Sequence, residues 1–330
     1  MEQYQDEINN LLLNTAVNKE QVFDFSFVPH AEEFQKTFAF YRQTLDQSVK
    51  WGIQNSYIFF INDTSANAKA GVSNGFGIIG INSGLIISLI INLNNRKEID
   101  EIIKIKYPGI YNNLDNPSNV LLYQVAQHFT FYHELAHLIQ KSDLLNNFLY
   151  ERPQQQEHFS IINHKLELDA DSFSALATAA HIHQYIFKIF GENIDNQKVE
   201  SIIELFCSGI LLYMLSFDAI KNEMYYEESS HPHPAIRLIN VVLIIVHYCK
   251  QSPRITEKGI ILDHGKIIDK IMENVMEIEY NVFGASKAKT LTAILGSERK
   301  NILSYYSKLK DLKVDQYIMA EQKWNETVPK

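Results

Sequence analysis

The segment His133-Glu134-Leu135-Ala136-His137 places the tightest constraint on what this chain can fold into. Histidines four residues apart lie on one face of an α-helix, so both imidazoles can reach one metal ion if the segment is helical. The surrounding sequence, from Ser118 to about Ser142, carries apolar residues at helical spacing. The sequence therefore predicts a long helix with an H-E-x-x-H motif on it, and a metal site at that motif.

A third protein ligand is required, and a second predicted helix, from about Ile161 to Phe190, offers one. Glu167 and Asp171 lie four residues apart on it, so both side chains point toward the same neighbour. Two histidines and one glutamate with an open position are an established arrangement for catalytic zinc. We therefore expect one Zn²⁺ per chain on His133, His137 and Glu167. Asp171 is then placed to accept the outer N–H of a ligand histidine.

Two other ligands stay open at this point. Asp143 stands where metzincins place their third histidine, but Gln140 occupies the position of the glycine that turns the chain there. His164 lies one helical turn before Glu167 and is also within reach of the predicted ion.

Composition excludes several classes of protein. The 330 residues are 46% hydrophobic and 21% charged, which is typical of a folded chain. A net charge of −9 argues against a general binder of nucleic acid or of anionic membranes. The two cysteines, Cys207 and Cys249, exclude a disulfide framework.

The expected location is the cytoplasm. The N-terminus is acidic and lacks the basic and apolar regions of a secretory signal. Glycine, polar or charged residues interrupt each of the three most apolar stretches, and we expect no transmembrane segment. Those stretches are residues 77–93, 202–217 and 236–248.

The remaining pattern predicts a mostly α fold with a small β-sheet (α+β). Two short runs rich in β-branched or aromatic residues read as strands, and Ser83 is expected to cap a helix that follows the second run. Residues 94–117 are polar and loop-like. The predicted strands are Tyr57–Ile61 and Gly75–Ile81, and further helices are expected at Val199–Asn222, at Ala235–Lys250 and over most of the remaining chain.

These segments resemble the gluzincin metallopeptidases of the CAAX prenyl protease and HtpX type. The resemblance lies in helix H-E-x-x-H, followed by E-x-x-A-D at residues 167–171. It extends upstream to an Asn-Ala element, a glycine-rich strand and a helix beginning Gly-Leu-Ile. Downstream, His231-Pro232-His233-Pro234-Ala235-Ile236-Arg237 matches the pattern H-P-x-x-x-x-R.

The resemblance implies a zincin-like metalloprotease core at residues 57–250, with helical extensions at 1–56 and 251–330. It implies that Glu134 is the general base for a zinc-bound water and that His231 stabilises the oxyanion, although His233 is a second copy of the same dipeptide. Arg237 would pair with Asp171. A free edge strand would bind substrate through Gly77, Ile78, Ile79 and Gly80, with Asn67 holding the substrate from the other side.

The expected function is that of a zinc-dependent endopeptidase acting on a cytoplasmic protein or peptide substrate. One alternative is a restrained binding or regulatory module that keeps the protease fold. Another is a phage-exclusion protease of the Lit type, which also carries H-E-x-x-H. Because an intracellular protease must be restrained, we expect a regulatory partner or self-inhibition. Residues 92–117 are the first candidate cover of the edge strand, and the helices after Thr256 are the second.

Overall fold

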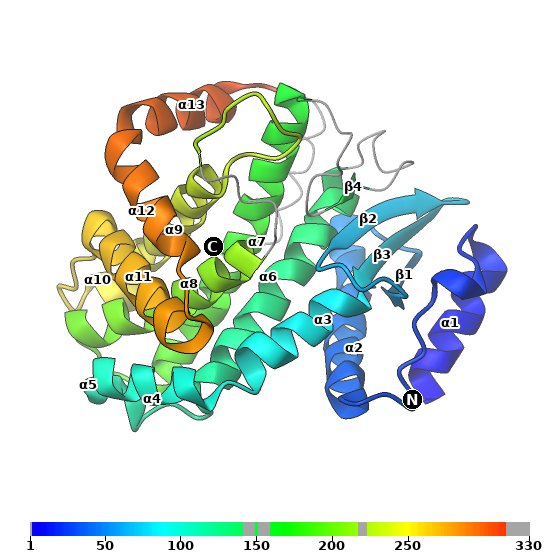
Figure 1. Cartoon of the computed structure of the whole chain (residues 1–330), viewed down its shortest axis with the longest axis horizontal. Helices are drawn as coiled ribbons and strands as arrows, with labels where there is room; N and C mark the ends of the chain where they lie inside the picture. The colour runs from blue at the N-terminus through cyan, green and yellow to red at the C-terminus, as the bar shows by residue number, and fades with distance from the viewer. Residues whose placement is uncertain (1, 141–148, 151–158, 217–222, 315–330) are drawn as a thin grey trace.

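The computed structural model describes residues 2–140, 149–150, 159–216 and 223–314. It is mostly helical with one small sheet, which confirms the predicted α+β class (Figure 1). The strands are β1 (Ser56–Ile61), β2 (Ala68–Ser73), β3 (Phe76–Asn82) and β4 (Leu149–Tyr150). The helices are α1 (Glu2–Asn14), α2 (Ala31–Asp46), α3 (Ser83–Leu89), α4 (Lys97–Lys106), α5 (Pro108–Tyr111), α6 (Ser118–Gln140), α7 (Ile161–Phe190), α8 (Asn196–Ser216), α9 (Pro234–Gln251), α10 (Pro253–Thr256), α11 (His264–Ile278), α12 (Lys287–Ser297) and α13 (Arg299–Asp311).

The sheet has the strand order β1-β3-β2-β4. β3 pairs in parallel with β1 and antiparallel with β2, so both of its sides are hydrogen-bonded. β2 is the strand that packs most closely on α6, and β4 pairs with its outer side at Lys69 and Ala70.

The prediction that residues 77–81 form a free edge of the sheet is therefore wrong. The prediction did not include β2, whose sequence Ala-Lys-Ala-Gly-Val-Ser has few of the residues that strands favour. Ile78 and Ile79 are completely buried, and no side of β3 is open for a substrate strand.

Packing explains the glycines of β3. A methyl group on Gly80 would lie 2.6 Å from Cδ1 of Ile61, and one on Gly77 would lie 3.2 Å from Cδ1 of Leu138. A side chain at either position would require Ile61 or Leu138 to shift, because the neighbouring strand and α6 approach β3 closely there. Their glycines serve the close approach of these elements.

α6 and α7 form the centre of the molecule and pack along each other (Figure 1). α6 carries apolar residues on most of its circumference. Nearly all of its residues are buried, as expected for a helix inside a core. α7 begins where the Ser160 hydroxyl accepts the Asn163 amide, and ends before Gly191, whose φ is +56°. On its other side α7 packs against α9.

The segment predicted to be a loop at residues 94–117 contains α4 and α5, so this prediction is also wrong. Ile99 and Ile103, four residues apart, are fully buried, and α4 packs against α6. The Ser118 amide and hydroxyl both donate to Asp100, which fixes α4 to the start of α6. Ser118 lies about 22 Å before His133 along the axis of α6. The segment is part of the core, and it does not cover β3.

The terminal helices share a hydrophobic core that is continuous across the described residues. α1 and α2 pack on β1, while α11 to α13 pack on α7, α8 and α9. Among the described helices, α8 is long and apolar enough to cross a membrane, and 94% of its most apolar 18-residue window is buried inside the protein.

Candidate metal centre

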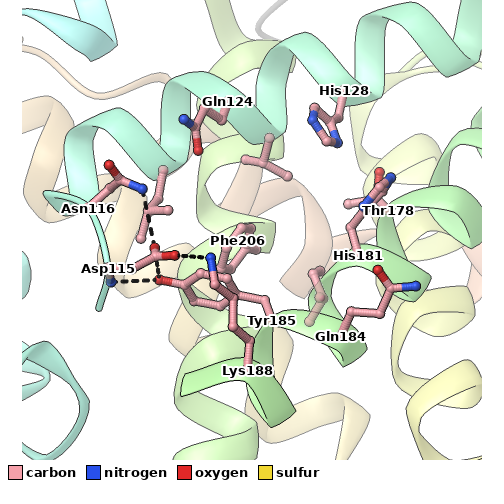
Figure 2. A pocket seen from close by; sticks show the side chains of 13 residues that line it. Asp115, Asn116, Gln124, His128, Thr178, His181, Gln184, Tyr185, Lys188 and Phe206 are labelled. Atoms are coloured by element: carbon pink, nitrogen blue, oxygen red, sulfur yellow. Dashed lines mark hydrogen bonds and ion pairs between the residues drawn. The ribbon is translucent and has the colours of Figure 1, made fainter. Parts of the chain in front are cut away.

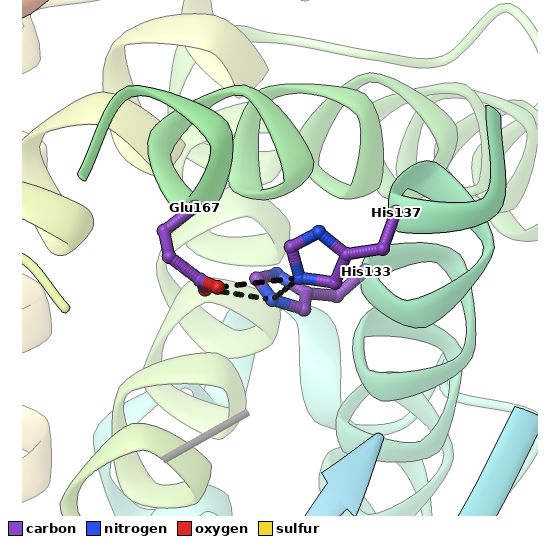
Figure 3. Close-up of side chains that lie close together, drawn as sticks. All are labelled: His133, His137 and Glu167. Carbon is purple, nitrogen blue, oxygen red and sulfur yellow. Dashed lines mark hydrogen bonds and ion pairs between the residues drawn. The ribbon is translucent and has the colours of Figure 1, made fainter. Parts of the chain in front are cut away.

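His133, His137 and Glu167 come together where α6 and α7 cross (Figure 3). The two histidine Nε2 atoms are 3.2 Å apart. Oε2 of Glu167 lies 3.2 Å from Nε2 of His133, and Oε1 of Glu167 lies 3.4 Å from Nε2 of His137. All three side chains are buried. The structure thus brings together the three residues expected from the sequence, as a group that could hold a metal ion.

The other nitrogen of each histidine has an acceptor of its own. Nδ1 of His133 lies 3.0 Å from Oδ1 of Asp171, and Nδ1 of His137 lies 3.0 Å from Oε1 of Gln140. Carboxylate and amide oxygens are acceptors, so each Nδ1 carries the hydrogen. Each Nε2 is therefore the ring nitrogen that faces the other histidine and the Glu167 carboxylate.

When both imidazoles are neutral, their Nε2 lone pairs and the carboxylate repel one another unless a cation lies between them, and the spacing of these atoms fits a bound ion. An ion bound tetrahedrally with bonds of about 2.1 Å separates neighbouring ligand atoms by about 3.4 Å. The two Nε2 atoms are 3.2 Å apart, which is close to that value, and each of them lies 3.2 or 3.4 Å from one oxygen of the Glu167 carboxylate. The donor set and its spacing therefore fit a divalent metal.

The histidines around Glu167 favour the charged form of its carboxyl group. Burial alone would raise its pKa, but the neighbouring imidazoles of His231, His137 and His133 more than offset this, and the pKa lies below its usual value. A carboxylate that stays ionised while buried is the form that binds a metal.

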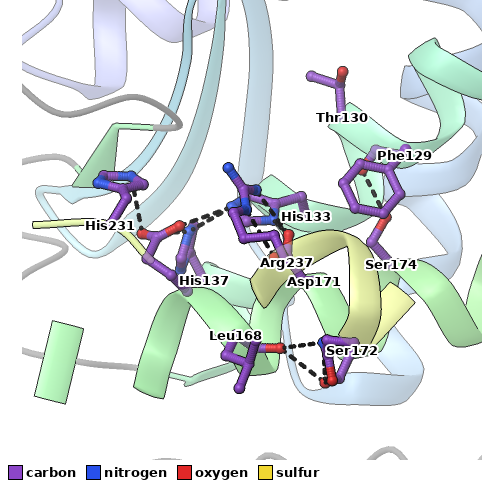
Figure 4. A network of polar contacts seen from close by, with 12 residues as sticks. Phe129, Thr130, His133, His137, Leu168, Asp171, Ser172, Ser174, His231 and Arg237 are labelled. Atoms are coloured by element: carbon purple, nitrogen blue, oxygen red, sulfur yellow. Dashed lines mark hydrogen bonds and ion pairs between the residues drawn. The ribbon is translucent and has the colours of Figure 1, made fainter. Parts of the chain in front are cut away.

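Asp171 and Arg237 make the contact expected from the resemblance (Figure 4). The Arg237 guanidinium donates to Asp171 through Nε at 2.8 Å and Nη2 at 2.7 Å, each to a different carboxylate oxygen. Burial would raise the pKa of Asp171, yet Arg237 and His133 hold it below its usual value. The pair fixes the carboxylate that orients His133.

Glu134 is fully buried beside the two histidines on α6. Burial, with smaller contributions from Tyr123 and the Glu134 carboxylate, raises the pKa of Tyr41 well above its usual value.

The structure distinguishes the two histidines of the His-Pro-His-Pro sequence. Nε2 of His231 lies 3.4 Å from Oε1 of Glu167 (Figure 4). Its Nδ1 lies 2.9 Å from the Ser230 hydroxyl. His233 instead caps α9, where its Nδ1 accepts the Ala235 amide at 3.1 Å. His231 is the one that lies beside the group that could hold a metal.

The alternative ligands fare differently. Nε2 of His164 lies 2.7 Å from the Ser229 carbonyl and Nδ1 lies 3.0 Å from the Tyr305 hydroxyl, so both ring nitrogens have hydrogen-bond partners outside the candidate metal group. Asp143 lies outside the described residues.

Asn67 precedes β2 and is buried. Its side-chain oxygen accepts the Ala68 amide and its carbonyl accepts the Asn82 amide, which joins the ends of β2 and β3. Its role in substrate binding remains a prediction.

Gln140 is the site residue that sequence reasoning missed. Its Oε1 accepts from His137, and its Nε2 donates to the Leu166 carbonyl at 2.8 Å, so it links α6 to the residue before Glu167. The available signal was its position three residues after His137, which places both on one helix face.

A separate cavity of about 380 Å³ lies between the first half of α6 and the second half of α7 (Figure 2). Asp115 and Lys188 form an ion pair at one end, and His128 and His181 line the other. Its lining, as far as the chain is described, includes none of the metal-site residues.

Comparison with models of known protein families, with curated proteins and with solved structures finds no match for this chain. The resemblance to gluzincins therefore remains a prediction, based on the motifs and on the geometry of the candidate site.

Proposed function

We propose that this chain is a zinc-dependent endopeptidase. The observation that carries the proposal is the convergence of two Nε2 lone pairs and one buried carboxylate, each imidazole oriented by its own acceptor. Two histidines and one glutamate suit zinc and leave a coordination position open. A site built only to stabilise the fold would instead close all four positions with protein ligands.

Zinc bound there would supply a Lewis acid that polarises a peptide carbonyl and makes water acidic near neutral pH. Glu134 would accept the proton of the attacking water and pass it to the leaving amine. His231, next to Glu167, would donate to the oxygen that becomes negative in the transition state. Arg237 and Asp171 would keep His133 in the tautomer that presents Nε2.

A restrained form of the same enzyme has one observation in its favour. His133, Glu134 and His137 are each 0% exposed and Glu167 is 3% exposed. A peptide bond of a substrate can reach these buried side chains only after the chain around them has opened. This supports an enzyme whose activity is held low until a partner or a change in the chain opens the site.

The deciding experiment compares the wild-type chain with Glu134→Gln. Glutamine keeps the size of the side chain but cannot accept the proton, and position 134 is not among the metal ligands. We expect both proteins to bind one zinc per chain, measured by elemental mass spectrometry. Hydrolysis of a reduced and carboxymethylated protein should fall by at least ~10³-fold in the variant.

His133→Ala is the companion variant, and it should lose zinc as well as hydrolysis. Zinc binding without any hydrolysis by the wild-type chain, under conditions that open the site, would contradict the endopeptidase. It would favour the binding module instead.

A further inference from the structure

The loop before α9, which carries His231, is held by the C-terminal helix α13. Near the upper end of α7, α13 lies beside this yellow-green loop (Figure 1). His164 on α7 connects the two: one ring nitrogen contacts the Ser229 carbonyl at 2.7 Å and the other contacts the Tyr305 hydroxyl at 3.0 Å. His164, Ser229 and Tyr305 are all buried.

The direction of each hydrogen bond follows from the chemistry of the partners. A carbonyl oxygen only accepts, so Nε2 of His164 carries the hydrogen and donates to Ser229. Burial lowers the pKa of His164 to about 4, which keeps the ring neutral at pH 7. Nδ1 is then an acceptor, and the Tyr305 hydroxyl donates to it. The relay Tyr305–His164–Ser229 has one consistent arrangement of protons.

We propose that Tyr305 is a positioning residue for His231. Through His164 it fixes the Ser229 carbonyl, two residues before His231, and so sets where the His231 ring lies over Glu167. The inference rests on the proposed function, because the role of His231 in hydrolysis is part of it. It assigns a task to the C-terminal helices: they complete the site from outside the segment that carries the motifs.

Other contacts between α13 and the loop are more exposed. Lys308 pairs with Glu227 at 3.0 Å, and the rings of Tyr226 and Tyr305 are 5.3 Å apart. Both members of the ion pair are about half exposed, and such pairs contribute little. A buried hydrogen-bond relay depends on its geometry far more, since loss of one partner leaves another buried group unsatisfied.

The chain offers a matched control in the next residue. Tyr306 lies on the same helix, and its hydroxyl donates to Oδ1 of Asn240 at 3.2 Å, on α9. Tyr305→Phe and Tyr306→Phe therefore each remove one hydroxyl and one interhelical hydrogen bond from α13. The first of these bonds leads to the His231 loop through His164.

The kinetic test measures kcat, KM and zinc content with a reduced and carboxymethylated protein as substrate. Tyr305→Phe should lower kcat about 10-fold, a part of the ~10²–10³-fold expected for complete loss of an oxyanion donor. KM and zinc content should stay within twofold, and Tyr306→Phe should leave all three unchanged. Equal losses in both variants would reduce Tyr305 to a general stabilising role and overturn the proposal.

A double-mutant cycle sharpens the test. If Tyr305 acts through His231, adding Tyr305→Phe to His231→Ala should cause no further loss of kcat. Additive losses would show that the hydroxyl acts on something other than His231, and would overturn the proposal.

A measurement without substrate separates failure of this inference from failure of the proposed function. Amide hydrogen exchange of residues 223–233 should become at least ~10-fold faster in Tyr305→Phe than in Tyr306→Phe. If the wild-type chain hydrolyses nothing yet this difference appears, the positioning role of Tyr305 is supported and the endopeptidase function is contradicted. If the wild-type chain hydrolyses the substrate but amide exchange is the same in both variants, the positioning role of Tyr305 is contradicted.

Discussion

The two histidines of the candidate metal centre are oriented by different kinds of acceptor. His133 donates to Asp171, whose charge is matched by the buried guanidinium of Arg237. His137 donates to the neutral amide of Gln140, which is itself fixed by the Leu166 carbonyl. An acceptor behind a ligand sets both the tautomer and the angle of the ring. The orientation of each histidine therefore depends on a residue outside the group that could hold the metal.

Gln140→Leu should weaken zinc binding by about 10–100-fold, because it leaves the outer N–H of His137 without its acceptor. Competition with a chromophoric chelator measures the change in Kd. Gln127→Leu is the matched control, since Gln127 is also buried on α6 and bonds to Tyr123 at 2.8 Å. The control should lose stability and keep the zinc Kd, and an unchanged Kd in Gln140→Leu would remove Gln140 from the site.

At the level of elements, α4 shows that a segment with mostly charged residues can be a helix of the core and not a loop. Charged residues occupy six of the positions between Lys97 and Lys106, which made the segment look solvated. Ile99 and Ile103 nevertheless form a stripe with helical spacing and are fully buried, while Ile105 points outward and is 80% exposed. A narrow apolar stripe is enough to fix a short helix when a larger one, α6, lies beside it.

Ile103→Ala should lower the free energy of unfolding by about 2–4 kcal/mol, because it opens a cavity between α4 and its neighbours. Ile105→Ala, on the same helix, should change it by less than about 0.5 kcal/mol. Urea denaturation measures both. Two equally small effects would show that α4 is not part of the core and would reopen its role as a cover.

At the scale of the whole molecule, the candidate metal centre lies within a large and continuous hydrophobic core. α6 and α7 are held by apolar packing against the sheet, α8 and α9, and the ligands lie in place through hydrogen bonds within the chain. Zinc should therefore stabilise a fold that already exists, in contrast to small zinc domains that fold only with metal.

Removal of zinc by a chelator should accordingly lower Tm without unfolding the protein at 25 °C. Free zinc at about 1,000 times its Kd adds roughly 4 kcal/mol to the free energy of unfolding. For a chain of 330 residues this corresponds to a Tm shift of about 6 °C. Scanning calorimetry with and without zinc measures the shift. His133→Ala should show no shift, and loss of helical circular dichroism on chelation would contradict a preformed core.

The sequence by itself determined those parts of the site that depend on spacing within one helix. His133 and His137, and likewise Glu167 and Asp171, are four residues apart, and helical periodicity alone puts each pair on one face. The long helices were predictable for the same reason, because their apolar residues repeat over many turns.

Tertiary structure decided what depends on partners far away in the chain. The strand order placed β3 in the centre of the sheet, since β2, with its weak strand signal, is held there by its pairing with β3 and its packing on α6. The choice of His231 over His233 required the position of Glu167 on another helix. Pairings between distant segments are set by the packing of the whole core, and no local pattern of residues encodes them.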